Sequence, residues 1–215
     1  MSIVIIGGTG NLGYGLALRL VNAGYKVTIG SRSKERALAT AEKIKKITGK
    51  YSINGMKNPI AVKEGDLVVL SVPNAGRRLI LTELKSFLQG KTIFDVTVPM
   101  AFNPLRYAPP KDGSNAKETK RICGDNVNVL AGLHTVSADL LNSLEKNISN
   151  SDVLIAGDNN KAKEKVIEIF SNLGMRAFDS GGLEQAATLE RLTVMIIGMN
   201  KRYKRKHIGI KLFGI

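Results

Sequence analysis

The chain has 215 residues, which suits one large domain with a sizeable core, and its 43% hydrophobic content is ordinary for a globular protein. Lysine and arginine number 32 against 18 acidic residues, a surplus that favours anionic partners. The absence of tryptophan weakens a nucleic-acid function, the single Cys123 excludes an internal disulfide, and no apolar run approaches the roughly 20 residues of a membrane span. We therefore expect a cytoplasmic protein with no nucleic-acid or membrane partner.

Strands and helices are expected to alternate along the chain. Short β-branched runs predict strands at residues 1–7, 25–30, 66–72 and 92–98, and amphipathic spacing predicts helices at 11–23, 34–47 and 79–88. Four prolines in residues 99–114 predict a loop. Shorter strands are expected at 127–133, 153–156 and 175–178, with helices at 160–173 and 183–199. This order predicts an α/β fold with a Rossmann-type, doubly wound and mostly parallel sheet, divided into residues 1–182 and a C-terminal helical part at 183–215.

The first turn carries a glycine pattern typical of dinucleotide-binding proteins. Gly8, Gly10 and Gly13 form GxGxxG directly after the first expected strand and before the first helix. The first glycine permits the tight turn, the second lets the backbone approach a pyrophosphate, and the third lets the helix pack closely on the strand. The unpaired N–H groups of the helix then face the anion. The alternative, a glycine-rich turn without a ligand, leaves this spacing unexplained.

The end of the second expected strand predicts which dinucleotide is bound. NAD-binding proteins place a carboxylate here, about 20 residues after the loop, to bond the ribose 2′-hydroxyl. This chain has Ser31 and Arg32 instead, with Arg36 one helical turn further on. A hydroxyl and two guanidinium groups bind a 2′-phosphate, so the segment predicts NADP. The alternative is a solvated start of a helix.

Further candidate ligands follow the other strands, because a ligand lies across the carboxyl ends of a parallel sheet. Arg78 could reach a phosphate or be a plain surface arginine. His134 could shape a ring pocket or cap its strand. The two histidines are not spaced for a metal site, so we expect no metal. No nucleophile motif is present, which favours hydride transfer by a cofactor. The strand-end candidates are Val72, Pro73, Asn74, Val98, His134 and Val136.

These motifs together resemble the archaeal NADPH-dependent reductases of the deazaflavin coenzyme F420. The resemblance rests on segments such as IGGTGNLGYGLALRL, IGSRSKERA, SINGMKN, AGLHTVSA and LIAGDNNKAKEKV. It implies NADP and coenzyme F420 as cofactors, with direct hydride transfer between the stacked nicotinamide and deazaflavin rings. By matching motif, it implies that NADP is held by Thr9, Gly10, Asn11, Leu12, Ser31, Arg32 and Arg36, with Val72, Pro73 and Ala138 along its path. His134, Val136 and Thr193 would border the deazaflavin.

Two alternatives stay open beside this reading. The first is another NADPH-dependent reductase, acting on an imine or on flavin and ferric iron. The second is an NADP-binding sensor without enzymatic activity. The apolar pattern at residues 183–199 also exceeds what a lone surface helix needs, which predicts a homodimer contact there.

Overall fold

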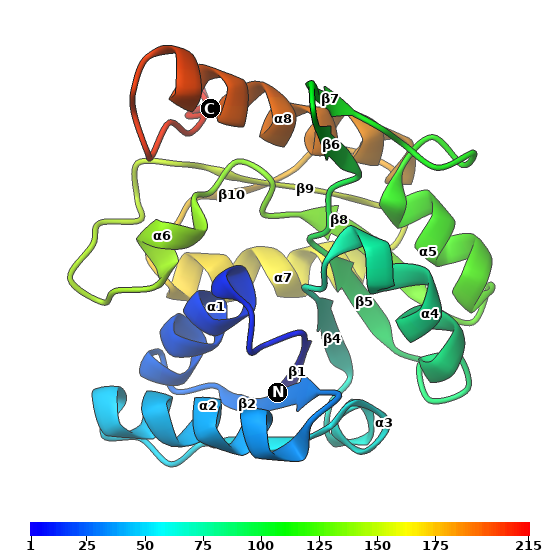
Figure 1. Cartoon of the computed structure of the whole chain (residues 1–215), viewed down its shortest axis with the longest axis vertical. Coiled ribbons are helices and arrows are strands. Elements are labelled where there is room, and N and C mark those ends of the chain that lie inside the picture. Colours follow the sequence, from blue (N-terminus) through cyan, green and yellow to red (C-terminus); the bar gives the residue numbers. More distant parts are fainter.

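One eight-stranded sheet organises the chain, and the computed structural model describes all 215 residues (Figure 1). Its strands lie in the order β10-β9-β8-β5-β4-β1-β2-β3, and only the β8–β9 pair is antiparallel. The strands are β1 (Ser2–Ile6), β2 (Lys26–Ser31), β3 (Ile53–Lys57), β4 (Leu67–Leu70), β5 (Thr92–Asp95), β8 (Asn128–Gly132), β9 (Val153–Gly157) and β10 (Ala177–Asp179). This confirms the predicted Rossmann-type, mostly parallel sheet.

Helices cover both faces of the sheet, and two separate clusters of buried side chains result. The helices are α1 (Asn11–Asn22), α2 (Lys34–Thr48), α3 (Asn58–Ala61), α4 (Asn74–Leu84), α5 (Asn115–Cys123), α6 (Ala138–Leu141), α7 (Asn160–Asn172) and α8 (Ala186–Arg202), with short 3₁₀ turns η1 (Val62–Glu64) and η2 (Leu183–Gln185). Strand β1 serves both clusters: Ile3 and Ile5 pack with α1, α2 and α7, while Val4 and Ile6 pack with α4 and α5. Burial on both faces explains why β1 is a continuous apolar run.

Several elements were not expected from the sequence. The expected loop at residues 99–114 contains the hairpin β6 (Met100–Phe102) and β7 (Leu105–Tyr107), and α5 follows it. Strand β3 was missed because Asn54 and Gly55 interrupt its apolar pattern. A Cβ at Gly55 would lie 2.4 Å from the carbonyl oxygen of Ala37, so glycine lets β3 run close under α2.

The helix after β4 also differs from its expected range. It begins at Asn74 and not at residue 79, and it ends at Leu84 and not at residue 88. Pro73 occupies the position before the first helical residue, and the polar start Asn74 to Arg78 hides the helical period. Position 74 thereby moves from a strand-end loop to the first turn of α4.

The C-terminal helix packs on the end of the sheet that carries β8 and β9, and against α5 and β7. The chain after it folds back onto the start of β9. There the Ile210 carbonyl accepts a hydrogen bond from the Asp152 N–H at 2.8 Å, and the Asp152 carboxylate pairs with Arg176 at 2.6 Å. No helix in the protein combines the length and the apolar character that crossing a bilayer requires.

Candidate functional site

A cleft of about 700 Å³ lies at the carboxyl ends of the parallel strands. It is bounded by residues that follow β1, β4, β5 and β8, together with residues of α8 and of the chain beyond it. Ligands of open α/β sheets bind at this edge, where the strand order reverses between β1 and β4. The predicted site residues that line the cleft are Gly10, Asn11, Leu12, Val72, Pro73, Asn74, Val98, His134, Val136, Ala138 and Thr193.

The glycine turn has the geometry that its spacing predicts. A Cβ at Gly13 would lie 2.7 Å from the Gly7 carbonyl oxygen, so the start of α1 packs directly on the turn. A Cβ at Gly8 would meet Ile29 of β2 at 2.8 Å. A Cβ at Gly10 has only the Gly7 oxygen near it, at 3.3 Å, and otherwise faces open space. The open side of Gly10 leaves room for a ligand to approach the backbone closely.

Helix α1 begins with donors that the protein leaves free. Its first helical hydrogen bond runs from the Tyr14 N–H to the Gly10 carbonyl, at 2.8 Å. The N–H groups of Asn11, Leu12 and Gly13 therefore have no acceptor within the helix, and no side chain caps them. Thr9 lies in the turn just before them. The positive end of the helix and these three N–H groups form a site for an anion such as pyrophosphate.

The end of β2 presents free positive charge. The Ser31 side chain is nearly buried, and Ser33 caps α2 by accepting a hydrogen bond from the Arg36 N–H at 3.2 Å. The guanidinium groups of Arg32 and Arg36 are exposed and take part in none of the ion pairs or side-chain hydrogen bonds of the protein. The only acid of this segment, Glu35, accepts a hydrogen bond from the Ser33 hydroxyl at 2.7 Å. Two arginines thus remain available beside Ser31.

A further cation at this end was missed by the sequence analysis. Lys57 ends β3, and the parallel register pairs it with Ser31. Its side chain is exposed. The missed strand β3 explains the omission, because without its register nothing relates Lys57 to Ser31.

The predicted phosphate ligand Arg78 lies apart from the cleft. Its guanidinium is exposed on α4 and pairs with the Glu118 carboxylate of α5, with Arg78 Nη2 2.7 Å from Oε1. A separate polar hollow between these helices contains both residues. The next-door Arg77 is buried, which the sequence did not indicate.

His134 lines the cleft and is held neutral. Its Nε2 lies 3.4 Å from the Thr97 carbonyl oxygen, and its buried Nδ1 has no hydrogen-bond partner in the protein. Burial lowers the pKa of the imidazole from 6.5 to about 4. The preceding Leu133 has a φ of 66°, a strained left-handed conformation for a leucine. The neutral ring therefore borders the cleft as a polar surface and not as a cation.

Apart from Thr193, the cleft residues of the C-terminal part could not be identified from sequence patterns. The side chain of Asn200 anchors the returning chain, since its Oδ1 accepts a hydrogen bond from the Ile208 N–H at 3.1 Å. Lys206, within the basic run, also lines the cleft. The rest of the lining combines apolar side chains with the polar Ser71, Thr97, Thr135, Ser137 and Asp139. The unpredicted lining residues include Val96, Met100, Phe102, Leu133, Ile196, Ile197, Asn200, Lys206 and Ile208.

One pair of reactive groups lies at the cleft, since the Ser137 hydroxyl, which lines it, is 3.2 Å from Nδ1 of the exposed His207. Burial raises the pKa of the Cys123 thiol to about 11, which disfavours its thiolate. No group of three or more His, Cys, Asp or Glu side chains is placed to hold a metal ion. The cleft therefore offers shape, apolar walls, an anion site at one end and exposed cations beyond it. These are the features of a site whose chemistry belongs to bound cofactors.

Known proteins are similar to this chain in sequence and in fold. The family described as NADP oxidoreductase, coenzyme F420-dependent, matches residues 2–99. The F420-dependent NADP reductase of Methanocaldococcus jannaschii is 37% identical over 99% of this chain and 98% of its own length. The F420-dependent NADP reductase of Methanothermobacter thermautotrophicus is 34% identical, over 99% and 94%. A solved structure from Arthrobacter sp. FB24, assigned as an F420-dependent NADP reductase, has a TM-score of 0.84 at 22% identity, with 99% of both chains covered.

Proposed function

The chain belongs to the family of F420-dependent NADP reductases, and from that premise we propose the chemistry of its cleft. The protein is an NADP-dependent oxidoreductase that uses NADP and coenzyme F420. When both are bound, they supply the reaction, a hydride transfer between nicotinamide and deazaflavin. The observation that carries the proposal is the continuity of the site: one cleft joins the free amides of α1 to an apolar chamber beside the C-terminal helix.

The residues of the first βα turn and of β2 fit NADP. We assign the pyrophosphate to the N–H groups of Asn11, Leu12 and Gly13, because these donors lack acceptors and a Cβ at Gly10 would project into open space. We assign the 2′-phosphate to Ser31, Arg32 and Arg36. Two guanidinium groups without protein partners supply charge-assisted hydrogen bonds that a 2′-hydroxyl cannot match.

The deeper part of the cleft fits two stacked rings. Val72, Pro73 and Val98 follow neighbouring strands and provide apolar surface, and Val136 and Ala138 continue it. Rings stacked against this apolar surface would be shielded from water on that side, which protects a hydride in transfer. His134 contributes a neutral imidazole whose unpartnered Nδ1 accepts a hydrogen bond from a bound N–H group. We assign it a role in orienting a ring and not in moving a proton.

We also propose a division of labour between the two parts of the chain. Residues 1–182 bind NADP, and residues 183–215 complete the deazaflavin pocket. Support comes from Thr193, Ile196 and Ile197 of α8, which line the same cleft as the strand ends. The two relatives reported above come from archaea, which supports an archaeal source for this chain.

A homodimer stays a prediction with a direct test. Met195 lies on α8 with half of its surface exposed, among partly buried apolar neighbours, so we expect a second copy to pack there. Sedimentation should give the mass of two chains for the wild type. It should give the mass of one chain for Met195→Glu, since a carboxylate in an apolar contact is strongly unfavourable. A single-chain mass for the wild type would remove this proposal.

The function is tested by an absorbance assay with purified protein, NADPH and oxidised F420. We expect NADPH consumption to match F420 reduction one for one, with no turnover when F420 is replaced by an imine or by flavin and ferric iron. Equal activity with either of those acceptors would favour another reductase. Tight NADPH binding without turnover of any acceptor would favour a sensor.

A further inference from the structure

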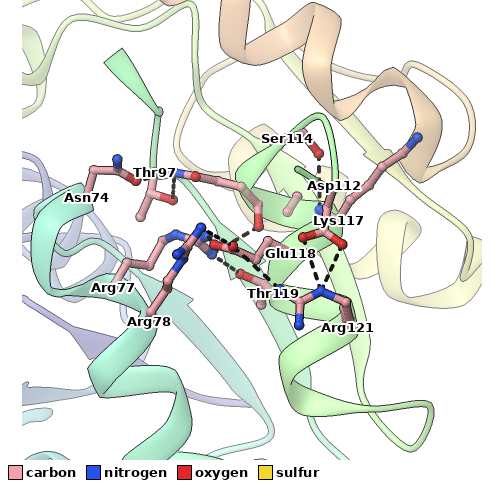
Figure 2. A network of polar contacts seen from close by, with 12 residues as sticks. Asn74, Arg77, Arg78, Thr97, Asp112, Ser114, Lys117, Glu118, Thr119 and Arg121 are labelled. Atoms are coloured by element: carbon pink, nitrogen blue, oxygen red, sulfur yellow. Dashed lines mark hydrogen bonds and ion pairs between the residues drawn. The ribbon is translucent and has the colours of Figure 1, made fainter. Parts of the chain in front are cut away.

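A buried polar cluster lies behind the cleft, between α4 and α5 (Figure 2). At its centre Arg77 is buried and bonds the Glu118 carboxylate and the Thr119 hydroxyl, the latter at 2.6 Å. The Asp95 carboxylate, at the end of β5, lies 3.7 Å from Arg77 and accepts a hydrogen bond from Thr119 at 2.6 Å. The cofactor assignments above leave this cluster without a role.

Asn115, the first residue of α5, connects the cluster to the cleft. Its side-chain amide donates to the Thr97 hydroxyl at 2.8 Å and to the Asn74 side-chain oxygen at 3.0 Å. Both line the cleft, Thr97 just after β5 and Asn74 in the first turn of α4. Asn115 itself is buried, and its bond to Thr97 is buried as well, so that bond does not compete with bulk water, whereas Asn74 is exposed.

The direction of these bonds follows from their neighbours. The Thr97 hydroxyl donates its only hydrogen to Asp95 Oδ1 at 2.6 Å, and the Thr97 N–H bonds the same oxygen at 2.9 Å. Toward Asn115 the hydroxyl can therefore only accept. An amide nitrogen satisfies this requirement, whereas a carboxylate at position 115 would set one acceptor against another.

The main chain of Asn115 is hydrogen-bonded to the C-terminal helix. Its N–H donates to Glu190 of α8 at 3.1 Å, and its carbonyl accepts from Arg77 at 3.0 Å. Glu190 also accepts hydrogen bonds from the Ala116 N–H at 3.2 Å and from the Tyr107 hydroxyl at 2.7 Å. One residue thus contacts α4, the end of β5 and α8, which are three separate walls of the cleft.

We propose that Asn115 is a positioning residue for hydride transfer, which fixes Thr97 and Asn74 in the places where they meet the bound rings. This inference rests on the proposed function. The Thr97 carbonyl is also the hydrogen-bond partner of His134 Nε2, so fixing Thr97 also fixes the position of the histidine ring. Asn115 makes no hydrogen bond to the end of β2 or to the start of α1, where we place the 2′-phosphate and the pyrophosphate. Loss of the amide should therefore disturb the geometry of the reaction and leave NADPH capture intact.

The test compares Asn115→Asp and Asn115→Ala with the wild type in the NADPH and F420 assay. Both changes keep the main-chain bond to Glu190, and Asn115→Asp also keeps the shape of the side chain. We expect kcat to fall about tenfold to a hundredfold, as small misplacements of reacting groups do, with KM for NADPH within about twofold. A matched control is Lys163→Met, which removes the ion pair of the buried Lys163 with the half-exposed Asp179, away from the cleft, and should leave kcat unchanged.

A double-mutant cycle separates positioning from general loosening of the fold. If Asn115 acts through the Thr97 hydroxyl, Asn115→Ala should reduce kcat little further in a Thr97→Val protein. Unchanged kcat in both Asn115 variants would overturn the proposal, as would fully additive effects or an equal loss in Lys163→Met. Failure of the proposed function is a different result, since wild-type protein would then not reduce F420 at all.

Discussion

The Thr193 hydroxyl of α8 donates a 2.7 Å hydrogen bond to the carbonyl oxygen of His134, the second residue after β8. The two residues are far apart in sequence, yet both line the cleft. This bond joins the C-terminal helix to the strand ends of the Rossmann sheet. A ring bound between them would contact both the strand ends of the sheet and the C-terminal helix.

The first prediction concerns selectivity for NADPH over NADH. Arg32→Ala removes an exposed guanidinium that has no partner within the protein. Losing a charge-assisted contact costs roughly 1.5–3 kcal/mol, or about tenfold to a hundredfold in affinity. Calorimetry should show that loss for NADPH and nearly unchanged NADH binding. Lys57→Ala should give a smaller loss with the same selectivity. An equal loss for both cofactors would refute the assignment of the 2′-phosphate.

The second prediction concerns the glycine turn. Gly10 has φ −85° and ψ 167°, which any residue can adopt, so Gly10→Val should fold with an unchanged circular dichroism spectrum. Its side chain would occupy the open space that we assign to pyrophosphate, and NADP binding should be lost. Gly76→Val is the matched control, because a Cβ there meets nothing within 4 Å and Gly76 does not line the cleft. Retained NADP binding in Gly10→Val would show that pyrophosphate lies elsewhere.

The third prediction concerns neighbouring arginines on α4. Arg77→Met leaves the buried carboxylates of Asp95 and Glu118 without their central cation and should cost about 3–5 kcal/mol of folding free energy. Arg78→Met removes an arginine whose side chain is 67% exposed, so its cost should stay below about 1 kcal/mol. Urea unfolding measures both. Because Arg78 lies outside the cleft, its variant should also keep the KM for NADPH, and a large rise would restore Arg78 as a ligand.

The fourth prediction concerns the pH dependence of stability. Burial raises the pKa of the Glu190 carboxyl from 4.5 to about 7. Between these values the unfolded chain has released the proton and the folded protein retains it, so Glu190 makes the protein less stable as pH rises. Glu190→Gln removes this dependence. Its stability relative to the wild type should improve by about 3 kcal/mol from pH 4.5 to pH 7.5. A difference that does not change with pH would contradict the raised pKa.

Local sequence patterns underlie the proposed NADP end of the site, and long-range contacts determine the rest of the cleft. Gly8, Gly10 and Gly13 have roles that follow from spacing within one turn, and their surroundings agree with those roles. The strand ends at Val72 and His134 were found because parallel strands end at one edge. Asn115 could not be found in this way. It begins a polar helix that the sequence did not indicate, and its partners Asn74, Thr97 and Glu190 come from three distant segments.

The C-terminal wall of the cleft could not be predicted from the sequence for a related reason. The basic run at residues 201–207 has the composition of a solvated surface, and only the return of the chain beyond it brings Lys206 and Ile208 to the cleft. Gly209 permits that return, because a Cβ there would collide with the Ser151 side chain. Single residues that are far apart in the sequence form this wall of the cleft, and no periodic sequence pattern identifies them.

The fifth prediction concerns His134. Because the pKa of the His134 imidazole is about 4, the pH profile of kcat should show no ionisation of His134 between pH 5 and pH 8. His134→Asn should keep turnover within roughly tenfold of the wild type, less than the 10²–10⁴ typical for loss of a general acid or base. A larger loss, together with a kcat that depends on one ionisation in the wild type alone, would make His134 a proton-transfer group.

The most direct measurement of the central claim follows deuterium from the C4 position of labelled NADPH, tested with each C4 epimer in turn. Direct transfer between stacked rings passes the hydrogen to no side chain, so none of it should exchange with water. Mass spectrometry of the reduced F420 should then find one full equivalent of label with one epimer and none with the other. Label recovered in water instead of in F420 would mean that the hydrogen passes through an exchangeable group, and direct hydride transfer would be wrong.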